Sequence, residues 1–295
     1  MVLWRVGLYA DFVVLKHTVF AIPFAYLGAL LASILSLKSL PALNILFWVG
    51  LAFFGARSGA MAINNLVDLD IDRKNPRTAN RPLPAGLIHK REVYMIIAVS
   101  YAVLFASAYM LNELCLALSP LVLITSVIYP YLKRFSWASH LILGLNLGYA
   151  PIGGWIAVTG ALHLPPTIHE LGVFALALAV IFWVAGFDVI YSLLDVEFDR
   201  RHGLHSIPAS LGVERALQIS AIFHALMFLL LIASHLLFGL GDLFALGLFV
   251  IGALLIYEHW IVTGVDPERI GVAFLRVNAC VSTSLLVFIV ADLII

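Results

Sequence analysis

Charged side chains are scarce in this sequence. Asp, Glu, Lys and Arg make up 12% of the 295 residues, whereas an ordinary soluble chain carries roughly 25%. Hydrophobic residues make up 63% of the chain, and the mean hydropathy is +1.05. A soluble domain of this length has too little interior to bury so much apolar surface. The composition therefore predicts an all-α polytopic membrane protein, because a helix satisfies its own backbone hydrogen bonds in lipid.

Cysteine, net charge and linker sequence are also lacking. Cys115 and Cys280 both lie in apolar runs, which favours small buried side chains over a disulfide or a metal pair. No group of Cys and His residues has the spacing of a zinc site. The formal net charge is zero, so the sequence gives no sign of a nucleic-acid partner. No Ser/Gly linker or low-complexity tract divides the chain, and we expect one domain over residues 1–295.

Nine apolar segments are near the roughly 20 residues that a helix needs to cross a bilayer. They lie at residues 17–36, 43–66, 92–112, 114–132, 137–160, 170–193, 213–238, 243–263 and 271–293. The break between the third and fourth spans is very short. We expect residues 1–15 to form an amphipathic helix in the headgroup region.

Lysine and arginine lie almost entirely on one side of these spans. That side carries Arg5, Arg73, Lys74, Arg77, Arg81, Lys90, Arg91, Lys133, Arg134, Arg200, Arg201 and Arg269. The opposite side carries Lys38. Because cytoplasmic loops are enriched in Lys and Arg, we expect the N-terminus and the basic cap loops in the cytoplasm, the C-terminus outside, and a multi-pass location in the cell membrane.

Acidic side chains form two rows, each at the end of an apolar segment. The first row holds Asn64, Asp68 and Asp72, and a spacing of four residues stacks side chains on one helical face. The second row follows the sixth span and holds Asp188, Tyr191, Asp195 and Asp199. Both rows open toward the basic side of the membrane, so they are expected to face one another across one cavity.

The combination of acidic rows and basic loops indicates a metal-bound diphosphate. Neighbouring carboxylates attract a divalent cation, and magnesium takes one or two of them while substrate phosphate fills other positions. Arginine and lysine bind the remaining phosphate oxygens. The nearby cations are Arg77, Arg81, Lys133, Arg134, Arg200 and Arg201. Calcium or a proton relay remains open on these residues alone.

A diphosphate site at the mouth of an apolar bundle indicates a lipid diphosphate whose tail runs between helices. If the tail is allylic, departure of the diphosphate leaves a carbocation. The aromatic residues Tyr129, Tyr131, Phe187 and Tyr191 lie near the same span ends. Their π faces can shield such a cation, although an interfacial aromatic belt explains Tyr131 equally well.

The two rows resemble the signatures of the UbiA superfamily of intramembrane prenyltransferases. The first family signature, NDxxDxxxD, reads NNLVDLDID from Asn64, with Asn65 at the second position. The second, DxxYxxxDxxxDxxxG, matches from Asp188 to Gly203. Smaller likenesses are PRTANRPLPAG from Pro76, YPYLKR from Tyr129 and GGWIA from Gly153. The chain looks most like the 4-hydroxybenzoate polyprenyltransferase branch, including relatives that act in menaquinone synthesis.

The resemblance implies nine transmembrane helices around a central cavity, Mg²⁺, an isoprenyl diphosphate donor and a hydrophobic or aromatic acceptor. It implies that magnesium and diphosphate are held by Asn64, Asp68, Asp72, Asp195 and Asp199. Substrate contacts are expected from Asn64, Arg57, Arg77, Lys133, Arg134, Tyr129 and Tyr191. Catalysis is expected from Asp188, Asp68 and Asp195, with Asp188 either accepting the proton of an acceptor phenol or orienting that phenol.

Four polar residues within the spans also require an explanation. Arg57 either binds an acceptor carboxylate or pairs with Asp68 or Asp188. We expect His17 to be a packed, hydrogen-bonded histidine. Arg276 and Asn278 are costly in lipid and predict buried partners.

The sequence therefore predicts a magnesium-dependent membrane polyprenyltransferase acting on an aromatic acceptor such as 4-hydroxybenzoate by electrophilic aromatic substitution. Other acceptors remain open, namely a menaquinone precursor, a glycerol ether lipid, or a haem or chlorophyll precursor. A cation-coupled secondary transporter is the alternative of a different class, because transporters also carry intramembrane carboxylates and internal repeats. The expected partners are the donor, the acceptor and the lipid bilayer.

Overall fold

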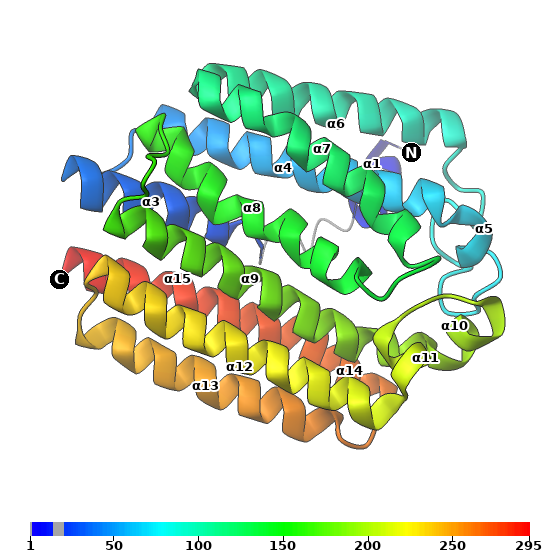
Figure 1. The fold of residues 1–295 in the computed structure, drawn as a ribbon. Coiled ribbons are helices and arrows are strands. Elements are labelled where there is room, and N and C mark those ends of the chain that lie inside the picture. The colour runs from blue at the N-terminus through cyan, green and yellow to red at the C-terminus, as the bar shows by residue number, and fades with distance from the viewer. Residues whose placement is uncertain (1, 14–20) are drawn as a thin grey trace.

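The protein is a bundle of long helices, described here from a computed structural model (Figure 1). The structure describes residues 2–13 and 21–295, and in these ranges every regular element is a helix. The first half comprises α1 (Val2–Phe12), α3 (Pro23–Leu37), α4 (Leu43–Val67), α5 (Leu69–Asp72), α6 (Lys90–Leu111), α7 (Glu113–Leu132) and α8 (Ser139–Thr159). The second half comprises α9 (Ile168–Ser192), η1 (Leu193–Asp195), α10 (Val196–His202), α11 (Ile207–Leu211), α12 (Val213–Phe238), α13 (Asp242–Val262), α14 (Pro267–Val272), η2 (Ala273–Val277) and α15 (Asn278–Ile294).

Eight helices of the described residues are long and apolar enough to cross a membrane. They match eight of the nine predicted spans. The span that begins with α9 continues through η1 and α10 to His202, the last one runs through α14, η2 and α15, and the other ends agree to within a few residues. The ninth prediction, residues 17–36, corresponds to the shorter apolar helix α3. Its first residues, including His17, lie outside the described part of the chain. The polytopic helical fold is therefore confirmed, whereas the count of nine spans is not.

One asparagine makes the short break between α6 and α7. Asn112 has an extended backbone, with φ −171° and ψ 170°, and its side chain accepts a hydrogen bond from Cys115 N. Its amide also donates to Ile156 O of α8 at 2.9 Å. The side chain thus caps the new helix and ties the turn to a neighbouring span, so a single residue is enough to reverse the chain.

Glycines allow α8 to lie very close to its two neighbours. A Cβ added at Gly154 would meet Ala25 O of α3 at 2.0 Å, and one added at Gly144 would meet Ile181 O of α9 at 2.3 Å. Small residues at helix contacts bring backbones together where lipid provides no hydrophobic driving force. The central helix α9 packs between α8 and α12, and its Trp183 is fully buried in the largest core cluster.

The amphipathic N-terminal segment is helical, as predicted, over Val2–Phe12. It docks where α4 ends and α6 begins. Asn65 donates its side-chain amide to Phe12 O at 2.9 Å, and Tyr9 donates its hydroxyl to Glu92 at 2.6 Å. Asn65 stands where the resemblance expects Asp, and a carboxylate at this buried position has no proton to donate to a carbonyl.

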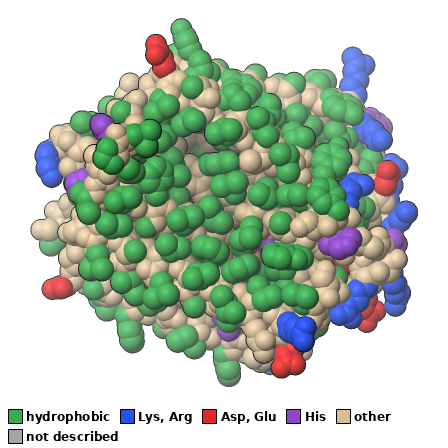
Figure 2. All heavy atoms as spheres, viewed as in Figure 1, with side chains coloured by type: hydrophobic (Ala, Val, Ile, Leu, Met, Phe, Trp, Pro, Cys, Tyr) green, Lys and Arg blue, Asp and Glu red, His purple; other side chains and the backbone are tan. Residues whose placement is uncertain are grey.

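The surface divides into an apolar middle and a basic end. Figure 2 shows hydrophobic side chains over most of the visible face, with Lys and Arg gathered at the end where Figure 1 places α5 and α10. The C-terminus lies at the opposite end (Figure 1). The two acidic rows therefore lie at the same end of the bundle, and this is the basic end.

Asn278 and Arg276 differ from one another in their surroundings. Asn278 is fully buried, donates to Glu258 at 2.9 Å and accepts from Trp183 Nε1 at 2.6 Å, which confirms the predicted partners. The same prediction is wrong for Arg276. This residue is exposed and makes no ion pair among the described residues, and it lies in the π-helical turn η2.

Candidate active site

The first acidic row keeps its helical spacing although the helix breaks. α4 ends at Val67, and α5 begins at Leu69. Asp68 N still bonds to Asn64 O at 2.9 Å, and Asp72 N bonds to Asp68 O at 2.8 Å. Asp68 and Asp72 are only 2% and 5% exposed. The predicted one-sided row is therefore present, and both of its carboxylates are buried.

Asp68 is neutralised from the end of α7. Lys133 forms an ion pair with Asp68 Oδ2, and Arg134 donates to Val67 O at 2.7 Å. Burial raises the pKa of the Asp68 carboxyl, with the Lys133 charge acting in the opposite direction. Its other oxygen, Oδ1, is buried and has no hydrogen-bond partner among the described residues. Asp68 thus has a free acceptor oxygen directly beside a cation.

The proline-containing loop after α5 folds back over Asp72. Thr78 Oγ1 donates to Asp72 O at 3.1 Å, and Arg81 donates to the Asp72 carboxylate at 3.1 Å. Asn75 Oδ1 accepts from Arg77 N at 3.0 Å. These bonds fix the direction in which the side chains of Asn75 and Arg77 leave the loop.

The same loop joins the first acidic row to the second. Asn75 donates its amide to Asp195 Oδ1 at 2.8 Å, and Arg77 Nε donates to the same oxygen at 2.9 Å. Arg77 also forms an ion pair with Asp195 Oδ2 and donates to the Tyr191 hydroxyl at 2.9 Å. The two signatures, more than 100 residues apart in the chain, therefore meet at one end of the bundle.

The second row ends in a loop that also contacts the first half of the chain. Gly203 ends α10 with φ +66°, a conformation that glycine adopts without strain. Ser206 Oγ then donates to Asp199 Oδ2 at 2.7 Å, and His205 N donates to Lys133 O at 2.7 Å. Lys133 is thereby held between Asp68 of the first row and the loop that follows the second.

Asp188 lies deeper than the other acids of its row. Its Oδ2 accepts a hydrogen bond from His140 Nδ1 at 2.7 Å. The Tyr129 phenol lies close enough to Asp68, Asp188 and Arg57 for their charges to act on it. Tyr129 thus lies near acids of both rows.

Several predicted basic and aromatic residues lie apart from this group. Arg201 pairs with Glu197 on the exposed surface, and Arg200 donates to Ala209 O. Tyr131 is 48% exposed and stacks under Arg134, whose guanidinium carbon lies 5.7 Å from the ring centroid. These contacts leave Lys133, Arg134, Arg77 and Arg81 as the cations of the site.

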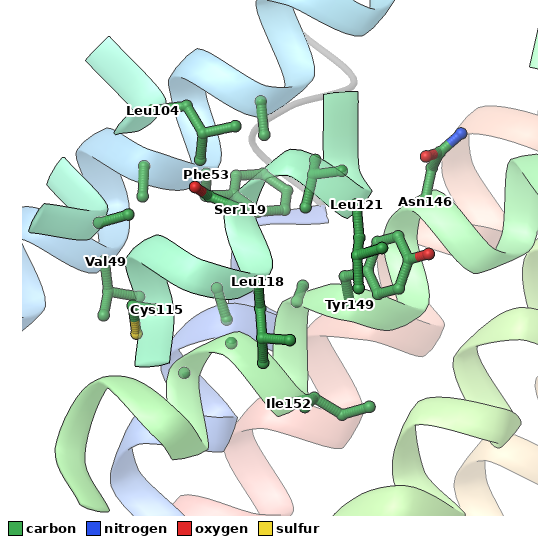
Figure 3. A pocket seen from close by; sticks show the side chains of 18 of the residues that line it. Val49, Phe53, Leu104, Cys115, Leu118, Ser119, Leu121, Asn146, Tyr149 and Ile152 are labelled. Carbon is green, nitrogen blue, oxygen red and sulfur yellow. The ribbon is translucent and has the colours of Figure 1, made fainter. Parts of the chain in front are cut away.

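An apolar cavity of about 310 Å³ lies between α4, α6, α7 and α8 (Figure 3). Figure 3 shows side chains of α4, α7 and α8 around it, with Asn146 and Tyr149 on one side. Among the residues that line it are Arg57, Val49, Phe53, Leu104, Leu118, Val122, Asn146, Gly153 and Ile156. The lining is almost entirely hydrocarbon, so the cavity is suited to an apolar chain.

Arg57 is the charged residue of this lining. The prediction that it pairs with Asp68 or Asp188 is wrong: none of the ion pairs within residues 2–13 and 21–295 includes it. Those carboxylates are instead engaged by Lys133 and His140. Arg57 Nε is buried and has no hydrogen-bond partner among the described residues. The residue as a whole is partly exposed and lines the cavity. A guanidinium inside a span is costly without a counter-ion, so the other predicted role of Arg57, binding an anionic ligand, is the one that the structure leaves.

The oxygen atoms of the site fit a magnesium ion that shares its coordination with a ligand. The described residues contain no group of three or more His, Cys, Asp or Glu side chains arranged to hold a metal. They do offer Asn64 Oδ1 and Asp68 Oδ1, both buried and without a hydrogen-bond partner. Magnesium needs few protein oxygens when water and phosphate complete its octahedron. The donor set therefore fits Mg²⁺ that is held together with a phosphorylated compound.

Two residues of the site were not predicted from the sequence. Asn75 bridges the loop to Asp195, and His140 bonds to Asp188. Nothing in the spacing of Asn75 distinguishes it from an ordinary turn residue. His140 carried a usable signal, because a histidine at the beginning of an apolar span is expensive without a partner.

Comparisons with known proteins match most of this chain to one family. The sequence profile of the UbiA prenyltransferase family matches residues 21–280. The 4-hydroxybenzoate octaprenyltransferase of Alkalilimnicola ehrlichii is 30% identical over 242 residues, which cover 82% of this chain and 80% of that protein. The enzyme of the same name from Vibrio atlanticus is 29% identical over 245 residues, 83% of this chain and 84% of that one.

Solved structures show the same fold. The apo structure of a UbiA homologue from Aeropyrum pernix K1 has a TM-score of 0.84 at 39% identity, covering 94% of this chain and 98% of that one. A UbiA homologue from Archaeoglobus fulgidus, solved bound to DMAPP and Mg²⁺, has a TM-score of 0.66 at 20% identity over 96% of this chain and 99% of that one. The chain therefore belongs to the UbiA prenyltransferase family and is an integral membrane prenyltransferase.

Proposed function

We propose that this enzyme transfers a polyprenyl group from its diphosphate to an aromatic carboxylic acid such as 4-hydroxybenzoate, with Mg²⁺ as cofactor. The observation that carries the proposal is the meeting of the two acidic rows at one end of a bundle that also contains an apolar cavity. The names of the relatives support the acceptor class. Family membership sets the transporter alternative aside.

The donor headgroup binds where the rows meet. Asn64 and Asp68 offer unpaired oxygens to the metal, and Asp72, Asp195 and Asp199 complete the acidic surroundings. Bound Mg²⁺ would stabilise the negative charge of the departing diphosphate. Lys133, Arg134, Arg77 and Arg81 are the cations that bind the phosphate oxygens. Lys133, Arg77 and Arg81 already pair with acids of the two rows, and Arg134 donates to Val67 O, so each cation is held in place before the donor arrives.

The polyprenyl tail occupies the apolar cavity. Its hydrocarbon lining excludes water from the allylic carbon, where water would otherwise intercept the carbocation. Tyr191 accepts a hydrogen bond from Arg77, and Tyr129 lies near Asp68 and Asp188, so both aromatic rings can shield the cationic end of the tail. Tyr191 is itself stacked on Phe274, with the ring centroids 4.1 Å apart, so its orientation is fixed.

The acceptor binds between Arg57 and Asp188. The Arg57 guanidinium takes the acceptor carboxylate, which supplies the counter-ion that the structure does not provide. Asp188 contacts the phenol. In the reaction the C–O bond to the diphosphate breaks, and its electron pair leaves with the diphosphate. A C–C bond then forms between the allylic carbon and the ring carbon that the hydroxyl activates, and one proton is released.

The active-site end of the bundle faces the cytoplasm in the cell membrane. The basic loops at this end are the support for this orientation, since positively charged loops remain on the cytoplasmic side. The C-terminus, at the other end of the bundle, then lies outside.

The test is prenyl transfer by the purified enzyme in lipid nanodiscs with Mg²⁺, a prenyl diphosphate and 4-hydroxybenzoate. D68N and D195N are expected to lose transfer by at least about 100-fold, as expected for removal of charge that stabilises a transition state. Matched controls are D70N and E197Q, because Asp70 and Glu197 lie beside the rows and are 88% and 86% exposed. Unimpaired transfer by D68N or D195N would refute the proposal.

A further inference from the structure

Asp188 is held by a histidine that the proposed function does not use. His140 is the second residue of α8, and its Nδ1 lies 2.7 Å from Asp188 Oδ2. The imidazole is 4% exposed, and the Asp188 side chain is 20% exposed. The contact is therefore largely shielded from water, where a hydrogen bond to a carboxylate is strong.

A second contact decides which nitrogen of His140 carries the proton. Ile207 N donates to His140 Nε2 at 3.2 Å. A ring nitrogen that accepts a hydrogen bond is unprotonated, so in the neutral imidazole the proton lies on Nδ1. His140 Nδ1–H accordingly donates to Asp188 Oδ2. The other carboxylate oxygen, Oδ1, makes no hydrogen bond that the described residues provide and remains available to a ligand.

The loop that orients His140 also shapes the donor site. Three successive residues of this loop each donate one hydrogen bond: His205 N to Lys133 O, Ser206 Oγ to Asp199 Oδ2, and Ile207 N to His140 Nε2. One short segment thus fixes a phosphate-binding lysine, an acid of the second row and the histidine behind Asp188. The donor side and the acceptor side of the site are joined through it.

We propose that His140 is a positioning residue for the transfer reaction, acting through Asp188. It fixes the carboxylate so that Oδ1 faces the acceptor phenol and accepts the phenol proton while the ring attacks the allylic carbon. The ring C–H proton then leaves, and Asp188 returns its proton to the oxygen, so one proton is released for each C–C bond formed. This inference rests on the proposed function.

Two variants separate the contacts of His140. The amide nitrogen of Asn can take the place of His Nδ1, so H140N keeps a donor to Asp188. The amide oxygen of Gln can take the place of His Nε2, so H140Q keeps an acceptor for Ile207 N. We expect H140Q to lower kcat for 4-hydroxybenzoate by roughly 10- to 100-fold, the range for a lost hydrogen bond to a charged group. The KM of the prenyl donor should be unchanged. H140N should keep most of the wild-type kcat.

Two further measurements distinguish positioning from a structural role. A ring-fluorinated 4-hydroxybenzoate, whose phenol is more acidic, should recover much of the H140Q rate relative to wild type. In the D188N background, H140Q should cause no additional loss, because the histidine acts through the carboxylate. Three results would each overturn the inference. They are a wild-type kcat in H140Q, an equal loss of kcat in H140N and H140Q, and a full further loss when H140Q is added to D188N. Absence of transfer by the wild-type enzyme would instead overturn the proposed function.

Discussion

Replacing Arg57 with Met tests the acceptor site and the fold in the same variant. Arg57 lines the apolar cavity, and its buried Nε has no hydrogen-bond partner among the described residues. Membrane-insertion scales put an arginine at the centre of a span at about 2.5–3.5 kcal/mol. Methionine has a similar length and no charge. R57M should therefore raise the thermal stability of the substrate-free enzyme, by up to about 2.5 kcal/mol.

The same change should weaken binding of the acceptor acid. A hydrogen bond to a charged group contributes about 1.5–3 kcal/mol, which corresponds to a loss of roughly 10- to 150-fold in affinity. Initial rates measured against 4-hydroxybenzoate and against its methyl ester separate the charge from the rest of the acceptor. R57M should raise the KM of the acid by this factor relative to the wild-type enzyme. The KM of R57M for the ester should be close to the KM of the wild-type enzyme for the ester, and the KM of the prenyl donor should be unchanged.

Two results would refute this reasoning. An unchanged KM for the acid would mean that the guanidinium does not contact the carboxylate. A fall in thermal stability would mean that Arg57 has a partner in the folded protein that offsets its burial. Either result would contradict the inference that Arg57, whose buried Nε has no hydrogen-bond partner among the described residues, binds the acceptor carboxylate.

Three further predictions concern other contacts of the site. R77K should raise the KM of the donor by about 10-fold or more, because lysine cannot reproduce the forked hydrogen bonds of Arg77 to Asp195 and Tyr191. An unchanged KM of the donor would show that these forked bonds are dispensable. N65D should lower stability by about 1–3 kcal/mol in thermal unfolding, since a carboxylate cannot donate a hydrogen bond to Phe12 O. The magnesium requirement of N65D should equal that of the wild-type enzyme, and a changed requirement would assign Asn65 to the metal. G153L should shorten the prenyl chains that the enzyme accepts, because Gly153 lines the cavity and a Cβ added there meets no atom within 4 Å. Mass spectrometry of the products formed from mixed donors measures the chain length, and an unchanged product length would contradict the prediction.

Hydropathy predicts the spans of this protein well because lipid imposes a single requirement on them. A helix in the bilayer needs a fixed length of apolar residues, so eight predicted spans match helices of the structure. The first span was harder to define. The described part of that run contains α3, Pro23–Leu37, and residues 17–20 of the predicted span lie outside the described part of the chain.

Side-chain partners were less predictable than the spans. The spacing of Asn64, Asp68 and Asp72 depends on local helical geometry alone, so this row could be predicted from the sequence. The partner of Asp68 depends on where the end of α7 packs, and this is how Lys133 rather than Arg57 reaches it. Arg276 is exposed and lies in a π-helical turn of the last span, and such a turn shifts the register of the residues that follow it. Sequence periodicity assumes a regular helix and cannot anticipate that shift.

The central claim is that both acidic rows hold one donor headgroup. The most direct test is Mg²⁺-dependent binding of a non-reactive prenyl thiolodiphosphate to the purified enzyme, measured as thermal stabilisation, which only a ligand of the folded state confers. Wild type, D70N and E197Q should show the full Mg²⁺-dependent stabilisation. D68N and D195N should each lose it, although Asp68 and Asp195 belong to different halves of the chain. Full stabilisation of either D68N or D195N would contradict the claim.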